Sequence, residues 1–491
     1  MKEGLPLLQE PAPPSAATTT ASPTIMALQR RKRRIGRATG SFAVALLVTL
    51  VLMLVSWSST QTASPTELES IMDEYRTNGF SGVVRVSHNG EGKFSDWMGH
   101  ANEEFEVPMA KHSIFPIGSN SKIFTAVAMY QLQERGLVNL SAPVNEYLNH
   151  ADFVAFGFAN QTQWCPRVLQ PAPSSSANCE NVTFVNLLNM GSGIDGRVVN
   201  DLAYYKGSIA KHVGAFINEP LVFRPGTNYS YTHANYVLLS YMIEKLSGQQ
   251  LDAYLSKQIF QPIGLKRTYY DPYSGGRYVH KGFVNQYADF YTQPRATVAT
   301  ETVQQKKEYL STGTCSPDVN SGALSGAGGI HSTMKDMHRV YKDLFHNRGR
   351  KSKVLSEASI RAMAQTRNPV RPSYAQGIEV AFDEADVARE WPSTISSCGQ
   401  MKCVVTCLAM QMPSADSSVI AGAFTNHIEF IFPTWDAFEQ WQPNQLWVAS
   451  PTGTPSNGAL TNGFDQSDYQ VGGLSWALLD AFLRYTRATE N

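Results

Sequence analysis

The sequence predicts an α+β fold in which an antiparallel sheet is assembled from both ends of the folded region, with a helical domain inserted between them and one transmembrane helix before them. Apolar residues alternate early in the chain around an Asn-Gly turn and again in three late segments, whereas the segments between them have helical periodicity. The expected strands are residues 80–87, 92–98, 377–382, 403–412 and 418–424. A cleft is expected where the sheet meets the helical domain.

The N-terminal region predicts a membrane anchor. Residues 1–40 are rich in Pro, Ala, Thr and Ser and end in a basic cluster, which is typical of a disordered tail. Residues 41–57 carry no charge and, with the three residues before them, can cross a bilayer as a helix. The basic residues lie only on the N-terminal side, so the positive-inside rule predicts a type II signal anchor with a cytosolic tail and a lumenal or extracellular remainder. A cleaved signal peptide is the alternative, but the long n-region favours the anchor.

Cysteines and glycosylation sequons agree with this orientation. All six cysteines follow the apolar segment, and an even count in an oxidising compartment predicts disulfides. Cys165 and Cys179 bracket a Pro/Ser-rich stretch and form a natural pair, while the other pairings stay open. The sequons are at Asn139, Asn160, Asn181 and Asn228. Residues 3–8 (EGLPLL) have the acidic dileucine form of a sorting signal, a pattern that also arises by chance, so both the plasma membrane and endolysosomal membranes stay open as destinations.

The overall composition is that of a globular protein. It has 41 basic and 41 acidic residues, a balance that gives no electrostatic reason to expect nucleic acid as a partner. After a short linker, 58–65, we expect one folded domain at 66–491, with insertions near 152–180 and 427–470. Helical periodicity at 65–76 is followed by the first two strands, which the turn at Asn89-Gly90 joins as a hairpin.

The stretch 115–132 (FPIGSNSKIFTAVAMYQL) carries the clearest chemical signal. If a helix begins at Ser119, then Ser119 and Lys122 share one helical face and can touch. The apolar run after them predicts a helix buried nearly all round, which Gly136 ends. Burial and the positive end of the helix dipole both lower the pKa of the Lys122 amine, so it could take the proton of Ser119 and create a nucleophile. The structural alternative is an N-capping serine and a surface lysine.

The pattern S-x-x-K occurs twice more, and its context separates the copies. Ser208 precedes Lys211 with no buried helix to follow. Ser332 precedes Lys335, but there Thr333 and Asp336 predict a capping box and an ordinary helix start. The surroundings therefore favour Ser119.

The remaining segments continue the helical domain and close the fold. Gly-rich turns mark the beginning or the end of several of the helices expected there. The expected helices are 181–194, 238–246, 251–259, 326–344, 356–364 and, at the end of the chain, 474–484.

These segments, in this order, resemble the serine β-lactamase-like hydrolases, a family that includes class C β-lactamases, DD-peptidases, esterases and eukaryotic β-lactamase-like proteins. The resemblance covers roughly residues 80–426. It is carried by FSGVVRVSHNG, FPIGSNSKIFTAVAMYQLQERGLVNLSAPVNEYL, LLNMGSGI, FRPGTNYSYTHANYVLLSYMIEKLSG and GAGGIHSTMKDM. It implies the β-lactamase/transpeptidase-like fold and acyl transfer with Ser119 as nucleophile and Lys122 as its base.

The resemblance also implies a second motif, Y-x-N, which here reads Tyr231-Thr232-His233. Tyr231 would share proton transfer with Lys122, because a phenol loses its proton more readily beside a charged lysine. The alternative is one more tyrosine in an aromatic core. His233 replaces the asparagine that holds the substrate amide, and imidazole cannot offer an amide's paired donor and acceptor, so substrate choice should differ.

The family's third motif, K-T-G or H-x-G, falls on Cys398-Gly399-Gln400, so its cationic or imidazole residue is lost. Gln400 and Met401 are expected to line the substrate site. The backbone N–H of Met401 would pair with that of Ser119 as an oxyanion hole, although a shift of the register by one residue stays open.

Two functions follow. The first is a membrane-anchored serine hydrolase that forms an acyl-enzyme through Ser119 on an ester or peptide-like amide, and the intact Ser119, Lys122 and Tyr231 favour it. The second is a non-catalytic or weakly catalytic lactamase-fold module for binding or assembly, which His233 and the altered third motif favour. No cofactor or metal is expected, because CxxC, HExxH, Walker A, GxGxxG and G-x-S-x-G patterns do not occur in a fitting context.

Overall fold

The computed structural model describes residues 65–77, 80–103, 105–168, 179–195, 207–270, 284, 321–365, 367–382, 391–401, 404–414, 416–426 and 478. The predicted cytosolic tail, the apolar segment 41–57 and the insertion 427–470 lie outside these residues. Among the residues that the structure describes, no helix is both long and apolar enough to span a bilayer.

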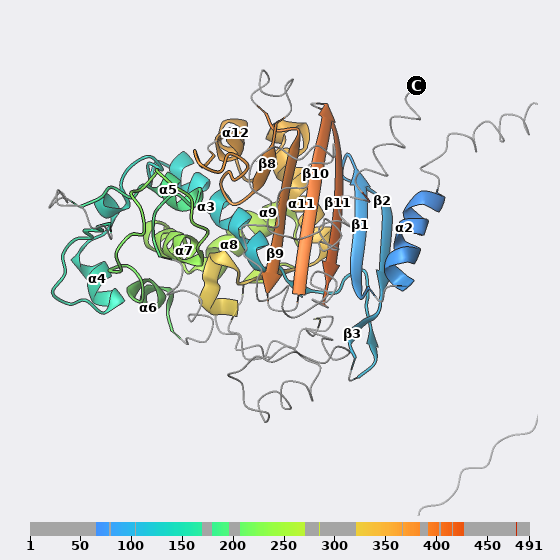
Figure 1. Ribbon diagram of the computed structural model, residues 1–491, viewed down its shortest axis with the longest axis horizontal. Helices are drawn as coiled ribbons and strands as arrows, with labels where there is room; N and C mark the ends of the chain where they lie inside the picture. The colour runs from blue at the N-terminus through green and yellow to red at the C-terminus, as the bar shows by residue number, and fades with distance from the viewer. Residues whose placement is uncertain are drawn as a thin grey trace, which may run out of the picture. The chain divides into compact units, whose positions relative to one another are not determined.

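A six-stranded antiparallel sheet forms the centre of the fold, with strand order β2-β1-β11-β10-β9-β8 (Figure 1). Its early strands pair with its late ones: Gly82 lies opposite Thr425 and His88 opposite Val419. The sheet is therefore assembled from both ends of the folded region, as predicted. The strands are β1 (Gly82–His88), β2 (Glu91–Met98), β8 (Glu379–Ala381), β9 (Thr394–Met401), β10 (Val404–Ser414) and β11 (Ser417–Thr425).

The turn between β1 and β2 has the predicted chemistry. Asn89 and Gly90 both have positive φ, 52° and 78°. A two-residue turn with this conformation matches the right-handed twist of the strands it joins, which is why Asn-Gly favours a hairpin there. Beside this hairpin lies α2 (Pro65–Thr77), whose Arg76 pairs with Asp96 of β2 at 2.8 Å.

The helical domain lies to one side of the sheet in Figure 1. Its central helix is α3 (Lys122–Glu134), which is buried from Lys122 to Leu132 and ends before Gly136, at φ 70°. The prediction of a helix buried all round is confirmed. The helices around it are α4 (His150–Phe156), α5 (Phe184–Leu188), α6 (Ile209–Gly214), α7 (His233–Ser247), α8 (Leu251–Leu255) with its continuation Ser256–Phe260, and α9 (Gln261–Ile263).

Two further helices pack against the sheet and the helical domain. The amphipathic α11 (Met334–Phe345) packs on β1 and β11, and α12 (Glu357–Gln365) contacts α3. A small sheet of β5 (Phe115–Pro116), β7 (Ile330–Ser332) and β6 (Tyr269–Tyr270) leads the chain into the nucleophile segment. A two-stranded pair, β3 (His100–Asn102) and β4 (Val107–Pro108), completes the strands of the described residues.

The two other S-x-x-K copies are structural. Ser208 caps α6, where its hydroxyl accepts from the backbone N–H of Lys211 at 3.4 Å. Thr333 caps α11 and accepts from the backbone N–H of Asp336 at 3.2 Å. The predicted capping box is wrong in its second half, because the Asp336 carboxylate accepts instead from the backbone N–H of Arg267 at 2.8 Å.

The disulfide prediction is confirmed for Cys165–Cys179, with an S–S distance of 2.02 Å. A second disulfide, which the sequence left open, joins Cys398 and Cys407 directly across β9 and β10. The predicted insertion 152–180 begins inside α4, since Phe153 is fully buried there. Of the predicted closing helix only Leu478 is described, and it is helical and buried.

Candidate active site

The nucleophile segment is a tight turn between β5 and α3. Ser119 lies in the 3-10 turn Gly118–Ser121, so the α-helix begins at Lys122 and not at Ser119 as expected. Gly118 has φ 50°, and a Cβ there would lie 2.4 Å from the carbonyl oxygen of Gln400. Glycine favours this conformation, and the missing side chain allows the close approach that holds the turn against β9.

Three of the predicted site residues come together at Ser119. Lys122 Nζ lies 3.0 Å from Ser119 Oγ, one helical turn away. The hydroxyl of Tyr231, 112 residues further along the chain, donates to the same oxygen at 2.6 Å. The serine hydroxyl is thus held between an amine and a phenol, the arrangement expected of an activated nucleophile.

Lys122 is buried in surroundings that favour its neutral form. Its side chain is 1% exposed, and desolvation holds the pKa of its amine well below the ordinary lysine value. Nζ donates to the carbonyl of Ala327 at 2.7 Å and lies 3.3 Å from Nδ1 of His233. A neutral amine that donates to these two acceptors directs its lone pair at Ser119 Oγ and can accept the serine proton.

Tyr231 is a proton donor in this site. Burial raises the pKa of its phenol, so the surroundings favour the protonated form. The sequence had predicted a phenol that ionises more readily beside a charged lysine. Its ring packs edge-on against Tyr374, with ring centroids 6.2 Å apart. Tyr374 packs in the same way against Tyr229 at 5.6 Å, and the guanidinium of Arg371 lies 5.0 Å from the Tyr229 ring. This aromatic cluster fixes the direction of the Tyr231 hydroxyl.

His233 is the first residue of α7 and lies beside Lys122. Burial, and then the charge of Lys122, lower the pKa of its imidazole to about 3, so the ring is neutral at physiological pH. Nδ1 faces the Lys122 amine, and we infer that the proton of the neutral ring is on Nε2. The residue can therefore offer one donor to a substrate.

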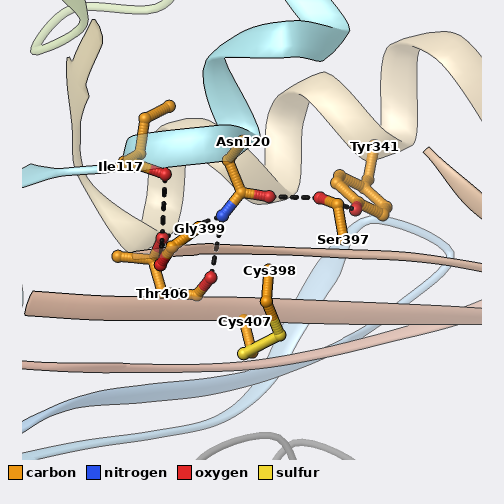
Figure 2. The surroundings of a disulfide bond; sticks show 8 residues. All are labelled: Ile117, Asn120, Tyr341, Ser397, Cys398, Gly399, Thr406 and Cys407. Carbon is orange, nitrogen blue, oxygen red and sulfur yellow. Dashed lines mark hydrogen bonds between the residues drawn. A yellow bond between two sulfur atoms is a disulfide. The ribbon is translucent and has the colours of Figure 1, made fainter. Parts of the chain in front are cut away.

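A buried polar network fastens the nucleophile turn to β9 and β10 (Figure 2). Asn120 is fully buried, and its Nδ2 donates to both the carbonyl and the hydroxyl oxygens of Thr406 at 2.8 Å. On its other side Asn120 Oδ1 accepts from Ser397 of β9, whose hydroxyl is 2.7 Å from that of Tyr341. Both polar atoms of the Asn120 side-chain amide are thus hydrogen-bonded, and these bonds fix the backbone directly after Ser119.

The strand register decides which backbone groups of β9 face the nucleophile. A Cβ on Gly399 would lie 1.8 Å from the carbonyl of Ile117 and 2.8 Å from the amide nitrogen of Ser119. The Gly399 carbonyl is 3.2 Å from Thr406 Oγ1, so its backbone groups face β10. Because these groups alternate along a strand, those of Gln400 face the other edge, toward Gly118, whereas those of Met401 face β10.

Sequence reasoning missed four contributors to the site: Asn120, Ser397, Thr406 and the carbonyl of Ala327. A polar residue inside the apolar segment 115–132 and the Gly-rich turn before residue 330 were the available signals. The partners on β9 and β10 are 277 and 286 residues from Asn120, and no local pattern connects them. Within the described ranges, no three His, Cys, Asp or Glu side chains come together in a way that could hold a metal ion.

Comparison with known proteins places this site in a family. The family model described as Beta-lactamase matches residues 68–390. Two proteins of Bacillus subtilis that are named as penicillin-binding proteins are each 26% identical, over 55% and 62% of this chain, and the matches cover 56% and 59% of their own lengths. The chain thus spans less than two thirds of either relative.

Solved structures share the fold. The octameric penicillin-binding protein homologue of Pyrococcus abyssi aligns with a TM-score of 0.54 at 19% identity, over 74% of this chain and 73% of that one. The D-amino acid amidase of Ochrobactrum anthropi aligns with a TM-score of 0.55 at 15% identity, over 87% of this chain and 99% of that one. With the family model matched over most of the described residues and the fold shared, the chain belongs to the β-lactamase family.

Proposed function

We propose that the protein is a serine hydrolase that acts through an acyl-enzyme at Ser119 on an ester or peptide-like amide. The observation that carries this proposal is the position of Ser119 Oγ, 3.0 Å from Lys122 Nζ and 2.6 Å from the Tyr231 hydroxyl. A module that only bound a partner would have no need of a buried, uncompensated lysine at this position. The names of the relatives, penicillin-binding protein and amidase, support a peptide-like amide, which the site would treat in the same way as an ester.

In the acylation step Ser119 Oγ bonds to the substrate carbonyl carbon while its proton passes to Lys122 Nζ. As the tetrahedral intermediate collapses, the bond to the leaving alkoxide or amine breaks, and the Tyr231 hydroxyl gives it a proton that Lys122 then replaces. The net result is transfer of the serine proton to the leaving group. In deacylation the oxygen of a water molecule bonds to the acyl carbon while one of its protons passes to Lys122 Nζ; the acyl–Oγ bond then breaks, Lys122 returns the proton to Ser119 Oγ, and the acid product leaves.

The developing oxyanion needs donors beside Ser119. We propose that the backbone N–H groups of Ser119 and Gln400 supply them, in place of the expected Met401. The orientation of Gln400 toward Gly118 and the close approach of Gly399 to the Ser119 amide support this revised register. Because these donors are backbone N–H groups, the loss of a cationic side chain from the third motif does not remove them. His233, with one donor, and the Gln400 side chain would then contribute to substrate choice.

We also propose that the catalytic domain is lumenal or extracellular and is anchored in the membrane by the apolar segment 41–57. The two disulfides of the described residues support an oxidising compartment. The one-sided basic cluster before the apolar segment supports the orientation. The membrane and the substrate are the only partners that this proposal requires.

Labelling with a fluorophosphonate tests the nucleophile. Wild-type protein should be labelled, Ser119→Ala should not, and Ser208→Ala should be labelled as wild type, because Ser208 belongs to another S-x-x-K copy and only caps α6. Labelling of Ser119→Ala at the wild-type level would show that another serine reacts. No labelling and no ester turnover by folded wild-type protein would favour the binding module.

A further inference from the structure

A pocket lies at the opposite edge of the sheet from Ser119. It has a volume of about 330 Å³ and is lined by β1, β2, the loop after β4 and the start of α11. β1 and β2 form one end of the strand order, whereas β9 lies near the other, with β11 and β10 between them. The pocket is therefore separate from the site described above. Its size is at the lower end of the range for small-molecule sites.

The pocket is strongly basic. Arg85, Lys111 and Lys335 line it, together with His112. Among the described residues these three cations have no ion pair. A concave surface with several cations and no compensating acid concentrates anions.

Two acidic residues on the elements that form the pocket, one on α11 and one on β2, are already engaged. Asp336, on the first turn of α11, pairs with Arg339 at 2.8 Å and accepts from the backbone N–H of Arg267 at 2.8 Å. Asp96 of β2 pairs with Arg76 of α2. Arg339 and Arg267 also lie close to the pocket: desolvation, and then the charge of Arg339, lower the pKa of Arg85, and desolvation, and then the charge of Arg267, lower the pKa of His112.

Arg85 is the central group of the pocket. Its Nε is buried without a hydrogen-bond partner, which is costly for a guanidinium. The guanidinium lies over Gly92 of β2, where a Cβ would be 2.2 Å from Nη2. Gly92 thus leaves the space that Arg85 occupies, and the side chain is held at the pocket with its charge unmatched.

The other walls of the pocket are apolar. Val83 and Met334 are buried, and the indole of Trp97 is 41% exposed, an unusual degree for so large an apolar side chain. An aromatic side chain beside cations can stack on a flat or apolar part of a ligand while the cations hold its charged end. A bare inorganic ion would leave these walls uncovered.

We propose that this pocket binds an organic anion, a molecule with a phosphate or carboxylate head and an apolar body. The head would lie against Arg85, Lys111 and Lys335, and the body against Trp97, Val83 and Met334. Free metabolites and anionic lipids can both combine a charged head with an apolar body. Binding of a soluble probe and binding of a lipid distinguish these two sources.

Calorimetric titration of the full-length protein in detergent, with phenyl phosphate as the probe, tests the proposal. Phenyl phosphate should bind at one site per chain, and phenethyl alcohol, its uncharged counterpart, should bind at least about tenfold more weakly. Arg85→Met and Lys335→Gln should each weaken phenyl phosphate binding about tenfold or more, the size of one charge-assisted contact. Lys335 is exposed, so its variant tests the pocket even if Arg85→Met fails to fold. Lys211→Gln, the same change at an exposed position on α6, should bind as wild type.

Several results would overturn the proposal. Equal affinity for phenethyl alcohol would remove the role of charge, and equal affinity for inorganic phosphate would remove the role of the apolar walls. Unchanged binding by both pocket variants would place the ligand elsewhere. Ser119→Ala should bind phenyl phosphate normally, so failure of the proposed hydrolase function would leave this result standing. In the same detergent titration, binding of a short-chain phosphatidic acid but not of the matching phosphatidylcholine, lost in Lys335→Gln, would identify a lipid headgroup as the source, whereas binding of phenyl phosphate alone would identify a soluble anion.

Discussion

The chemistry proposed for Lys122 depends on the lack of a carboxylate beside its amine among the described residues. Its amine contacts a carbonyl, a hydroxyl and a neutral imidazole, and no carboxylate of the described residues hydrogen-bonds to it. A carboxylate within hydrogen-bond distance of the amine would stabilise its charged form and raise its pKa, whereas burial alone lowers the pKa. The same residue type that forms a surface ion pair elsewhere in the chain is therefore available here as a base.

Lys122→Arg should inactivate the protein as thoroughly as Lys122→Ala. Arginine keeps the positive charge but cannot lose its proton in a protein, so it cannot act as the base. We expect a loss of about 10²- to 10⁴-fold in kcat for a nitrophenyl ester. Lys211→Arg, at the corresponding position of another S-x-x-K copy, should have wild-type turnover. Appreciable activity in Lys122→Arg would mean that the lysine acts only through its charge.

Tyr231→Phe should keep the fold and lose catalysis. The change removes one hydroxyl and leaves the ring in its contact with Tyr374. Because the hydroxyl is the donor nearest to Ser119, we expect kcat to fall about 10²-fold with little change in the melting temperature. Tyr229→Phe is the matched control, since Tyr229 belongs to the same aromatic cluster but is not hydrogen-bonded to Ser119. If both variants turned over alike, Tyr231 would be a packing residue.

The pH profile should have one ascending limb, set by Lys122 and not by His233. A base works when deprotonated, so activity rises with pH through the pKa of Lys122, which burial holds well below the ordinary lysine value. His233, with a pKa of about 3, stays neutral above pH 5. His233→Asn should therefore preserve the shape of kcat/KM against pH while changing the ratio between an ester and the matching amide. Loss of a limb near pH 6.5 in that variant would show that the imidazole titrates.

The sequence predicted the side chains that meet at the candidate site better than the groups that position them. Ser119 and Lys122 are neighbours on one turn, so local spacing was enough. The oxyanion donor that we propose, Gln400, lies one residue before the expected Met401, because counting back from Pro413 does not show how β9 is aligned with the turn that carries Ser119. That alignment is set by Gly399 and by the contacts of Asn120 with Ser397 and Thr406, all of them long-range.

Among the elements, the strands that the sequence revealed are those with apolar alternation. β1, β10 and β11 were found close to their observed bounds, and so was the buried α3. β9, with the sequence TISSCGQM, was missed because its side chains serve the site: Ser397 bonds Asn120, Cys398 forms a disulfide and Gly399 makes room for Ser119. A strand buried through polar contacts does not have the pattern of a strand buried through apolar ones.

The disulfide between β9 and β10 should affect catalysis more than stability. It joins directly opposed residues, Cys398 and Cys407, one position away from Gly399 and Thr406, which hold the nucleophile turn (Figure 2). Replacing both cysteines by serine should let β9 shift against Ser119, and we expect kcat to fall about tenfold or more, because a displacement of about 1 Å can cost as much as 10²-fold.

Cys165→Ser with Cys179→Ser is the control for this prediction. That disulfide lies in the helical domain and contacts none of the site residues, so its loss should lower the melting temperature with kcat unchanged. Equal effects of the two double variants on kcat would mean that the β9–β10 disulfide only stabilises the fold.

On the scale of the whole molecule, the decisive question is on which side of a membrane the folded domain lies. The disulfides are typical of an oxidising compartment, and all four sequons are exposed in the structure, at Asn139, Asn160, Asn181 and Asn228. In a lumenal domain the oligosaccharide transferase would reach these loops, whereas a cytosolic domain would carry no glycan. Glycosylation therefore reports the orientation independently of enzymatic activity.

Expression of the full chain in cells with a secretory pathway should give a glycoprotein whose mobility on a gel increases after endoglycosidase treatment. The variant with Asn139→Gln, Asn160→Gln and Asn181→Gln together should lose most of this shift. Asn228 contributes least, because its backbone carbonyl is bonded to Asn368 and it lies three residues before Tyr231, where a glycan would crowd the nucleophile. Unshifted wild-type protein that cytosolic protease can digest in sealed vesicles would reverse the orientation. The domain would then have to keep its disulfides in a reducing compartment, where we expect the Cys165–Cys179 bond, with Cys179 exposed, to be reduced more readily than the Cys398–Cys407 bond, with Cys407 buried.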